Sequence, residues 1–202
     1  MSCFESSTFL KNPAVMNQDI LEKACIKLGW RCERKIENGI KIFLVYDVGQ
    51  TSNLHGEFAL KVEGNQVTFN SFYLKNGREL ASELESHFYT INVEYAYETI
   101  LREFQAVGFK FLPDSKFVES ETEKKRFKMV AHSRMANETE KRTEIEFTIK
   151  FDGTIVTDSN YIPEDIHKLA DKAMESIDSA FGTKRMEGEH IKRKPIPLKY
   201  KN

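Results

Sequence analysis

The 202-residue sequence predicts an α+β fold: an antiparallel sheet of successive hairpins, helices that cover one face of it, and a smaller C-terminal ββα unit. Segments with apolar residues three and four positions apart, typical of amphipathic helices, flank short segments in which apolar residues alternate, typical of strands. Turn-forming residues separate the alternating segments at hairpin spacing. The composition agrees, because 40% hydrophobic and 11% aromatic residues suffice for a packed core.

Two stretches in the first half of the chain carry the helical period. Asn17 can cap a helix that ends at Gly29 and has this apolar face: Ile20, Leu21, Ala24 and Leu28. Residues 77–88 are helical in composition, and a stripe at spacings of four and three continues from them: Val93, Tyr97, Ile100, Phe104 and Val107. Gly108 stands where a left-handed helix end belongs, and a strand follows it.

The sequence between these two predicted helices has the pattern of successive β-hairpins. The strand-like segments RCERKI (31–36) and IKIFLVYD (40–47) are separated by the turn-forming sequence Glu-Asn-Gly, and residues 57–74, EFALKVEGNQVTFNSFYL, repeat the pattern. Sequential hairpins build an antiparallel sheet with one face to cover. We expect the helices near 17–28 and 78–107 to cover it.

The tyrosines near the start of the second stripe point in different directions. Tyr97 lies on the apolar stripe, whereas Tyr95 is about 200° of helical rotation away. We therefore expect Tyr97 in the core with its hydroxyl at the boundary. Tyr95 is expected to be the more exposed of the two and available to a partner.

The composition changes after Val118, where charged residues become dense. This predicts an edge strand or a linker between subdomains. Alternating apolar residues then return, a hairpin turn follows at Asp152-Gly153, and a last helix opens near Pro163. The predicted organisation is a main α+β domain at 1–118, a charged linker or edge strand at 119–142, a ββα unit at 143–183 and an extended basic tail at 184–202.

Charge and cysteine usage narrow the class of protein. The 30 basic and 31 acidic side chains leave a formal net charge of -1, which argues against a protein that coats nucleic acid over its whole surface. Cys3, Cys25 and Cys32 are odd in number and lack CxxC spacing, which disfavours a disulfide framework or a zinc knuckle. Phosphate-binding glycine motifs and a nucleophile elbow are also missing, so no cofactor is expected.

The sequence also predicts the compartment. It has neither a signal-peptide pattern nor an apolar run of about 20 residues, the length that spans a bilayer. We expect no membrane contact and a cytoplasmic location, or the plastid stroma if the protein is organelle-encoded.

Several short segments resemble a known family. They are the start MSCF, the helix end Leu28-Gly29-Trp30, and residues 92–111, NVEYAYETILREFQAVGFKF. Together they are similar to the hypothetical chloroplast reading frame thirty-five and its bacterial relatives, the domain of unknown function twelve-fifty-seven. Members carry a Tyr-Ala helix that runs into Gly-Phe and a strand, as in this chain at Tyr95-Ala96-Tyr97 and Gly108-Phe109. This resemblance covers residues 1–118.

From Thr143 onward the sequence resembles a second small family without assigned function, often found beside or fused to the first. Two positions depart from the family patterns. Cys3 stands where the first family has His, and residues 160–163 replace a Gly-rich turn and a Cys before the last helix. These departures weaken a metal or redox role at those positions. The resemblance implies a soluble accessory protein, often encoded near an AAA+ ATPase.

The leading hypothesis for function is a non-enzymatic binding or adaptor protein that serves a larger machine such as an AAA+ ATPase. Its candidate contacts are the Tyr95 side of the helix, the sheet edge and the basic tail, which holds Lys192, Arg193, Lys194, Lys199 and Lys201. The prolines of the tail should keep it extended, and it could bind an acidic groove, phosphates or only solvent.

An RNA- or DNA-binding module is the first alternative. It would use the tail and a basic cluster around one aromatic residue: Lys124, Lys125, Arg126, Phe127 and Lys128. Such a cluster can pair with phosphates while a base stacks on the ring, although acidic residues just upstream weaken the local field.

A small metal-dependent enzyme is the second alternative. Glu83 and His87 are four residues apart on a helix and can share an ion, and Glu79 extends the row. The same spacing is also common on solvated helix faces.

Overall fold

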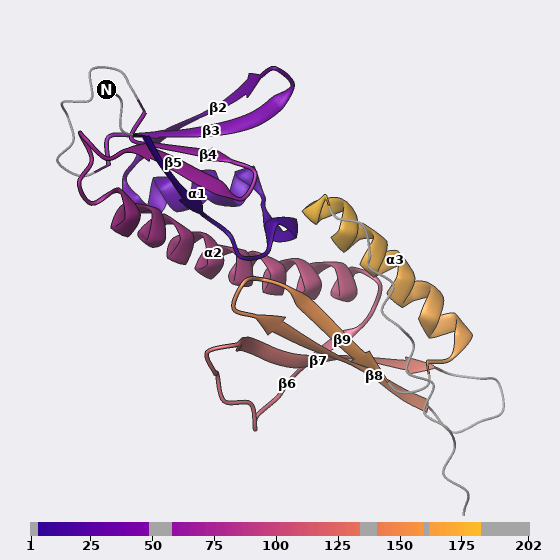
Figure 1. Ribbon diagram of the computed structural model, residues 1–202. Coiled ribbons are helices and arrows are strands. Elements are labelled where there is room, and N and C mark those ends of the chain that lie inside the picture. Colours follow the sequence, from indigo (N-terminus) through magenta and orange to yellow (C-terminus); the bar gives the residue numbers. More distant parts are fainter. Residues whose placement is uncertain (1–3, 49–57, 134–140, 160–161, 183–202) are drawn as a thin grey trace, which may run out of the picture.

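The computed structural model describes residues 4–48, 58–133, 141–159 and 162–182 (Figure 1). It contains two antiparallel sheets of five and four strands together with α-helices, which confirms the predicted α+β class. The elements of the first half are β1 (Phe4–Thr8), η1 (Pro13–Val15), α1 (Gln18–Leu28), β2 (Arg31–Glu37), β3 (Ile40–Tyr46), β4 (Leu60–Glu63) and β5 (Gln66–Asn70). They are followed by α2 (Gly77–Ala106), β6 (Lys110–Pro113), β7 (Glu123–Ser133), β8 (Lys141–Lys150), β9 (Ile155–Ser159) and α3 (Glu164–Phe181).

The first sheet has the strand order β1-β5-β4-β3-β2. Helix α1 and the first half of α2 cover one of its faces (Figure 1). The sequence predicts cover from residues 17–28 and 78–107, which is wrong for the second half of α2, because that half packs against the second sheet. Asn17 caps α1 through its side-chain oxygen, which accepts the backbone N–H of Asp19 at 2.8 Å. The strand predicted to continue to residue 74 ends instead at Asn70, because the Asn70 side chain accepts the N–H of Phe72 at 3.0 Å and turns the chain.

The second sheet has the order β6-β7-β8-β9, so β7 is an inner strand. The expectation that residues 119–142 are a linker or an edge strand is therefore wrong for 123–133. Phe127, Met129 and Ala131 point into the core, and the intervening charged side chains form ion pairs on the outer face. Strand β6, expected within the 1–118 domain, pairs with β7 and belongs to this sheet.

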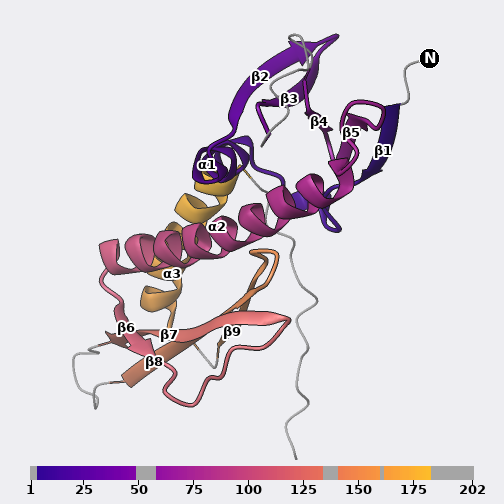
Figure 2. The same ribbon diagram turned by 90° about the vertical axis from the view of Figure 1, so that its left-hand side faces the viewer.

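Helix α2 connects the two sheets and buries a different side against each. Its first half packs Ala81, Leu84 and Phe88 against the first sheet, and its second half packs Ala96, Ile100 and Phe104 against the second sheet. Phe88 and Phe104 are 16 positions apart, which at about 100° per residue places them about 160° apart around the helix. The sheets accordingly lie on opposite sides of α2 (Figures 1 and 2).

The chain contains an internal repeat that shares α2. Each unit is a helix, a left-handed glycine, a buried aromatic residue, four consecutive antiparallel strands and a closing helix. Gly29 and Gly108 have φ of 72° and 97°, and Trp30 and Phe109 follow them. In both units the backbone N–H of this aromatic residue donates to the backbone carbonyl five residues earlier, at 2.9 Å in the first unit and 3.0 Å in the second. The units differ in that β1 pairs with β5 in the first unit.

Asn92 joins the units at the middle of α2. Its buried Nδ2 donates to the carbonyl of Asp152 at 2.9 Å, at the turn between β8 and β9. Gly153 has φ of 85°, and a Cβ there would lie 2.2 Å from Asn92 Nδ2. Phe151, next in the same turn, packs against Tyr89 with ring centroids 5.5 Å apart. These contacts hold the second sheet to α2 at the point where the buried side of the helix changes.

We predict that Gly153→Ala is more destabilising than Gly64→Ala in urea unfolding. Both glycines have positive φ, but nothing lies within 4 Å of the Cβ position at Gly64. Gly64→Ala should cost about 1 kcal/mol from backbone strain alone, and Gly153→Ala about 3 kcal/mol because the methyl group also collides with Asn92. The collision should couple Gly153→Ala to Asn92→Ala in a double-mutant cycle. Equal losses for the two glycines would contradict this close contact.

Candidate binding surfaces

The basic cluster predicted to bind nucleic acid lies on β7. Its aromatic member, Phe127, is 2% exposed and packs between two other rings. The centre of the Phe127 ring is 5.1 Å from that of Tyr97 and 5.5 Å from that of Phe147. The prediction that Phe127 stacks on a base is therefore wrong, because the ring is part of the second core. Arg126 and Lys128 share the outer face of the sheet, whereas Lys125 lies on the face covered by α2, since successive strand residues point in opposite directions.

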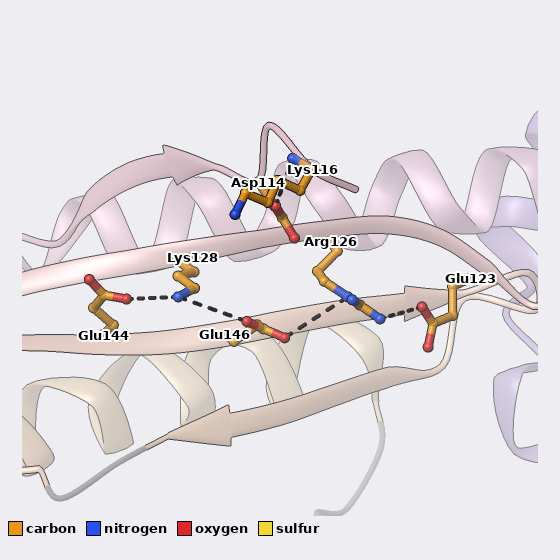
Figure 3. A network of polar contacts seen from close by, with 7 residues as sticks. All are labelled: Asp114, Lys116, Glu123, Arg126, Lys128, Glu144 and Glu146. Atoms are coloured by element: carbon orange, nitrogen blue, oxygen red, sulfur yellow. Dashed lines mark hydrogen bonds and ion pairs between the residues drawn. The ribbon is translucent and has the colours of Figure 1, made fainter. Parts of the chain in front are cut away.

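A ladder of opposite charges runs across the outer face of β7 and β8 (Figure 3). The Lys128 ammonium nitrogen lies 2.9 Å from a carboxylate oxygen of Glu144 and 4.0 Å from one of Glu146. The Arg126 guanidinium lies, from nitrogen to carboxylate oxygen, 3.9 Å from Glu146 and 2.6 Å from Glu123. The hydrogen bond between Lys128 and Glu144 raises the pKa of the lysine and lowers the pKa of the carboxyl group. Nearby, Asp114 accepts the backbone N–H of Lys116 at 3.0 Å.

The other two basic residues of β7 are also paired. Lys124 lies 3.0 Å from Glu119, and Lys125 lies 2.8 Å from Glu94 on α2. The Lys125 ammonium additionally sits 4.7 Å from the centre of the Tyr97 ring. Every basic side chain of this cluster therefore has a carboxylate neighbour, which reduces the positive field available to phosphates.

The structure separates the two tyrosines as predicted. Tyr97 packs against the second core, and Tyr95 packs against the first. Tyr95 is only half-buried, yet its ring is already in contact with both flanking helices. Phe181 of α3 is 5.2 Å from it, and the Lys23 ammonium of α1 is 5.3 Å from its centre. These contacts leave less of the ring for the partner role that the sequence suggests.

The remaining sequence-predicted sites gain no support. Glu79 and Glu83 are exposed, and Nδ1 of the half-buried His87 lies 3.1 Å from the carbonyl oxygen of Glu83. Within the described ranges, no group of three or more His, Cys, Asp or Glu side chains could hold a metal ion. Burial raises the pKa of Cys25 and of Cys32, which disfavours a thiolate nucleophile. The tail residues Lys192, Arg193, Lys194 and Lys199 lie outside the described residues.

A cleft of about 470 Å³ lies between the two units, and no pattern in the sequence indicates it. Leu21, Phe43 and Val62 contribute apolar side chains, and Phe181 at the end of α3 contributes to the opposite wall. Arg34 at this cleft is held by ion pairs with Asp19, at 2.7 Å, and with Glu22. Such an arrangement can take up an apolar group, but the charged side chain beside it is already neutralised.

Four aromatic residues gather at the end of β1 and β5, and we call them the aromatic corner: Phe4, Phe58, Phe72 and Tyr73. Phe4, Phe72 and Tyr73 are exposed by 48%, 61% and 57%. Phe4 stacks on Phe58 at 6.0 Å and pairs with Asn70 in the β1–β5 register, while Phe72 meets Tyr73 edge to face at 5.0 Å.

The aromatic corner continues into an apolar row on the outward face of β3. Phe58 packs against Ile42, Leu44 and Tyr46, which alternate with the core residues of that strand. Strand β1, which carries Phe4, forms one edge of the first sheet. Sequence patterns do not indicate this surface, because its members come from four separate segments and the alternation of residues 71–74 is typical of a strand.

Comparison with protein-family models, with curated proteins and with solved structures finds no match for this chain. The family resemblance of the sequence therefore remains a prediction. Over the residues that the structure describes, no helix has the length and apolar character needed to cross a membrane.

We predict that Glu144→Gln destabilises the chain at neutral pH by a small amount, as expected for an exposed pair. The folded-state pKa of Glu144 lies below its ordinary value of 4.5, so ionised Glu144 stabilises the fold above that pH. This contribution is lost as the pH falls through the folded-state pKa, and thermal unfolding curves of the two proteins should then converge. Glu121→Gln, at an exposed site outside the ladder, is the matched control. A difference that persists in acid would contradict the assignment to charge.

Proposed function

We propose that the chain is a non-enzymatic adaptor that binds a protein partner through the aromatic corner and the adjoining edge of β1. One observation carries this proposal: Phe4, Phe72 and Tyr73 are all exposed, and the pairing of Phe4 with Asn70 places them at the same end of the β1–β5 strand pair. Large aromatic side chains are enriched at the centres of protein interfaces, because they bury much apolar area at a low cost in conformational entropy. An edge strand adds main-chain hydrogen-bonding groups that an extended partner segment can use.

The difference between the outer faces of the two sheets favours the same surface. Both sheets are built from the same repeated unit, and each has one face turned away from its helices. The outer face of the second sheet neutralises its own charges through the Lys128 and Arg126 ladder. The outer face of the first sheet carries the apolar row that leads from Phe58. Ile42, Leu44 and Tyr46 of this row are already buried, so a partner would cover the exposed aromatic side chains of the corner beside them. Burying those side chains is favourable, whereas desolvating the ladder is costly.

The partner proposed here belongs to a larger machine, such as an AAA+ ATPase, as the family resemblance implies. The site of action would be the cytoplasm, or the plastid stroma if the protein is organelle-encoded. The nucleotide site of such a complex would come from the partner, because this chain carries no phosphate-binding glycine motif. The nucleic-acid alternative has less support, since the basic residues of β7 are paired and Phe127 is buried.

We predict that the double variant Phe72→Ala/Tyr73→Ala loses a protein partner that the unmodified chain recovers from native lysate. Two exposed aromatic anchors should account for at least about 2 kcal/mol of binding, which corresponds to roughly a thirtyfold loss of affinity. The measurement is a pull-down with quantitative mass spectrometry, repeated after nuclease treatment. Folding should be unaffected, because both side chains are exposed.

Val118→Ala is the matched control for this experiment, because Val118 is 82% exposed and distant in sequence from the aromatic corner. It should retain the partner. The proposal fails if the double variant recovers the same proteins as the unmodified chain. It also fails if nuclease removes every partner, which would favour the nucleic-acid alternative.

A further inference from the structure

The internal repeat points to a vacant position beside β9. In the first unit, β5 is the last strand of the meander, and β1 pairs with its outer edge in antiparallel register. In the second unit, β9 is the last strand, and no described strand pairs with its outer edge. The chain that enters the second unit is α2 itself, so it cannot supply a counterpart of β1. The main-chain groups on this edge of β9 are available to an added strand.

We propose that residues 196–201 of this same chain add to β9 as an antiparallel strand. Their sequence, Ile-Pro-Leu-Lys-Tyr-Lys, alternates apolar residues with proline or lysine. An edge position tolerates proline, and lysine is a common edge residue because it discourages further pairing. The proposed strand therefore suits the last position of a sheet and no inner one.

The faces of β9 match this alternation. Thr157 pairs with the core residue Phe147, so its side of β9 faces the core, and Thr157 is nevertheless exposed. Ile196, Leu198 and Tyr200 would extend the core over this side. On the opposite side, Val156 is 44% exposed and Asp158 makes no ion pair within the described part of the chain. Lys199 and Lys201 would lie on that side.

Charge also favours β9 over two other sheet edges, β2 and β6. Residues 183–202 contain seven basic and two acidic residues, a net charge of +5. Strand β9 contains one acidic residue, Asp158, and no basic residue. Strand β2 carries three basic and two acidic residues, and β6 contains Lys110 and ends at Pro113. By its charge, β9 therefore suits a basic segment better than β2 or β6 does.

The connection is long enough. Helix α3 has 18 residues, about 27 Å at 1.5 Å per residue, and it carries the chain away from the end of β9. Residues 183–195 can span up to about 43 Å at 3.3 Å per residue, so they can return the chain to that end. Attachment to the same chain gives the segment a local concentration on the order of millimolar, which favours it over a free strand from another protein.

The test is hydrogen exchange of β9 in the full chain and in a variant that ends at Glu189. We expect β9 amides to exchange about fivefold or more faster in the shortened variant, because each loses about one net hydrogen bond. Strand β6, the opposite edge of the same sheet, should be unchanged. A synthetic peptide of residues 190–202, added to the shortened variant, should restore the protection of β9 and lose this effect as salt is raised.

A second variant keeps the chain length. Lys199→Glu/Lys201→Glu should expose β9 as the deletion does, whereas the control Lys184→Glu/Arg185→Glu, with the same change in charge, should not. Identical β9 exchange in the full chain and in both of the first two variants would overturn the proposal. Protection that disappears on dilution of the full chain would also overturn it, because the added strand would then come from a second copy.

Discussion

Helix α2 has to bury apolar side chains on two nearly opposite sides, and the placement of the other elements depends on this. A helix that covers one sheet needs one stripe, but the stripe of α2 moves from Leu84 and Phe88 to Ile100 and Phe104. Each half of the helix therefore requires its own sheet. Asn92 lies where the stripe changes, and its side chain donates a hydrogen bond to the hairpin of the second sheet there. Because 30 residues of helix extend about 45 Å, the two cores stay separate while one rigid element fixes both.

Local patterns in the sequence predicted most of the helices and hairpins, because the elements are amphipathic with the expected periods. The prediction was wrong for β7, where a stretch such as Lys124 to Lys128 resembles a solvated linker. Lys125 and Lys128 have carboxylate partners that are distant in sequence, Glu94 and Glu144. A strand that pairs charges on one face and buries Phe127 on the other is indistinguishable by composition from an unpaired charged segment. Only the register between β7 and β8 separates the two cases.

The candidate surfaces were less predictable than the fold for a different reason. The aromatic corner depends on where β5 ends. The strand ends at Asn70, whose side chain accepts a hydrogen bond from the backbone N–H of Phe72 and turns the chain. Alternation alone favoured continuing the strand through Phe72 and Tyr73. The cleft between the units is likewise assembled from α1, the first sheet and the end of α3, which no short-range pattern relates. By contrast, the helical period separated Tyr95 from Tyr97 correctly, because that relation is local to one helix.

The repeated unit explains why the two halves can differ in function while sharing a framework. The left-handed glycine and the buried aromatic residue that follows it, Gly29-Trp30 and Gly108-Phe109, fix how a helix enters its meander, and the inner faces fix the cores. The outer faces and outer edges of the sheets take part neither in the junction between helix and meander nor in the packing of the cores. On these surfaces the units diverge: β3 carries an apolar row, β7 and β8 carry paired charges, and only β5 has an added strand among the described residues. Under the proposed function, specificity for a partner would come from the outer surfaces, since the residues that define the repeat are already used in packing.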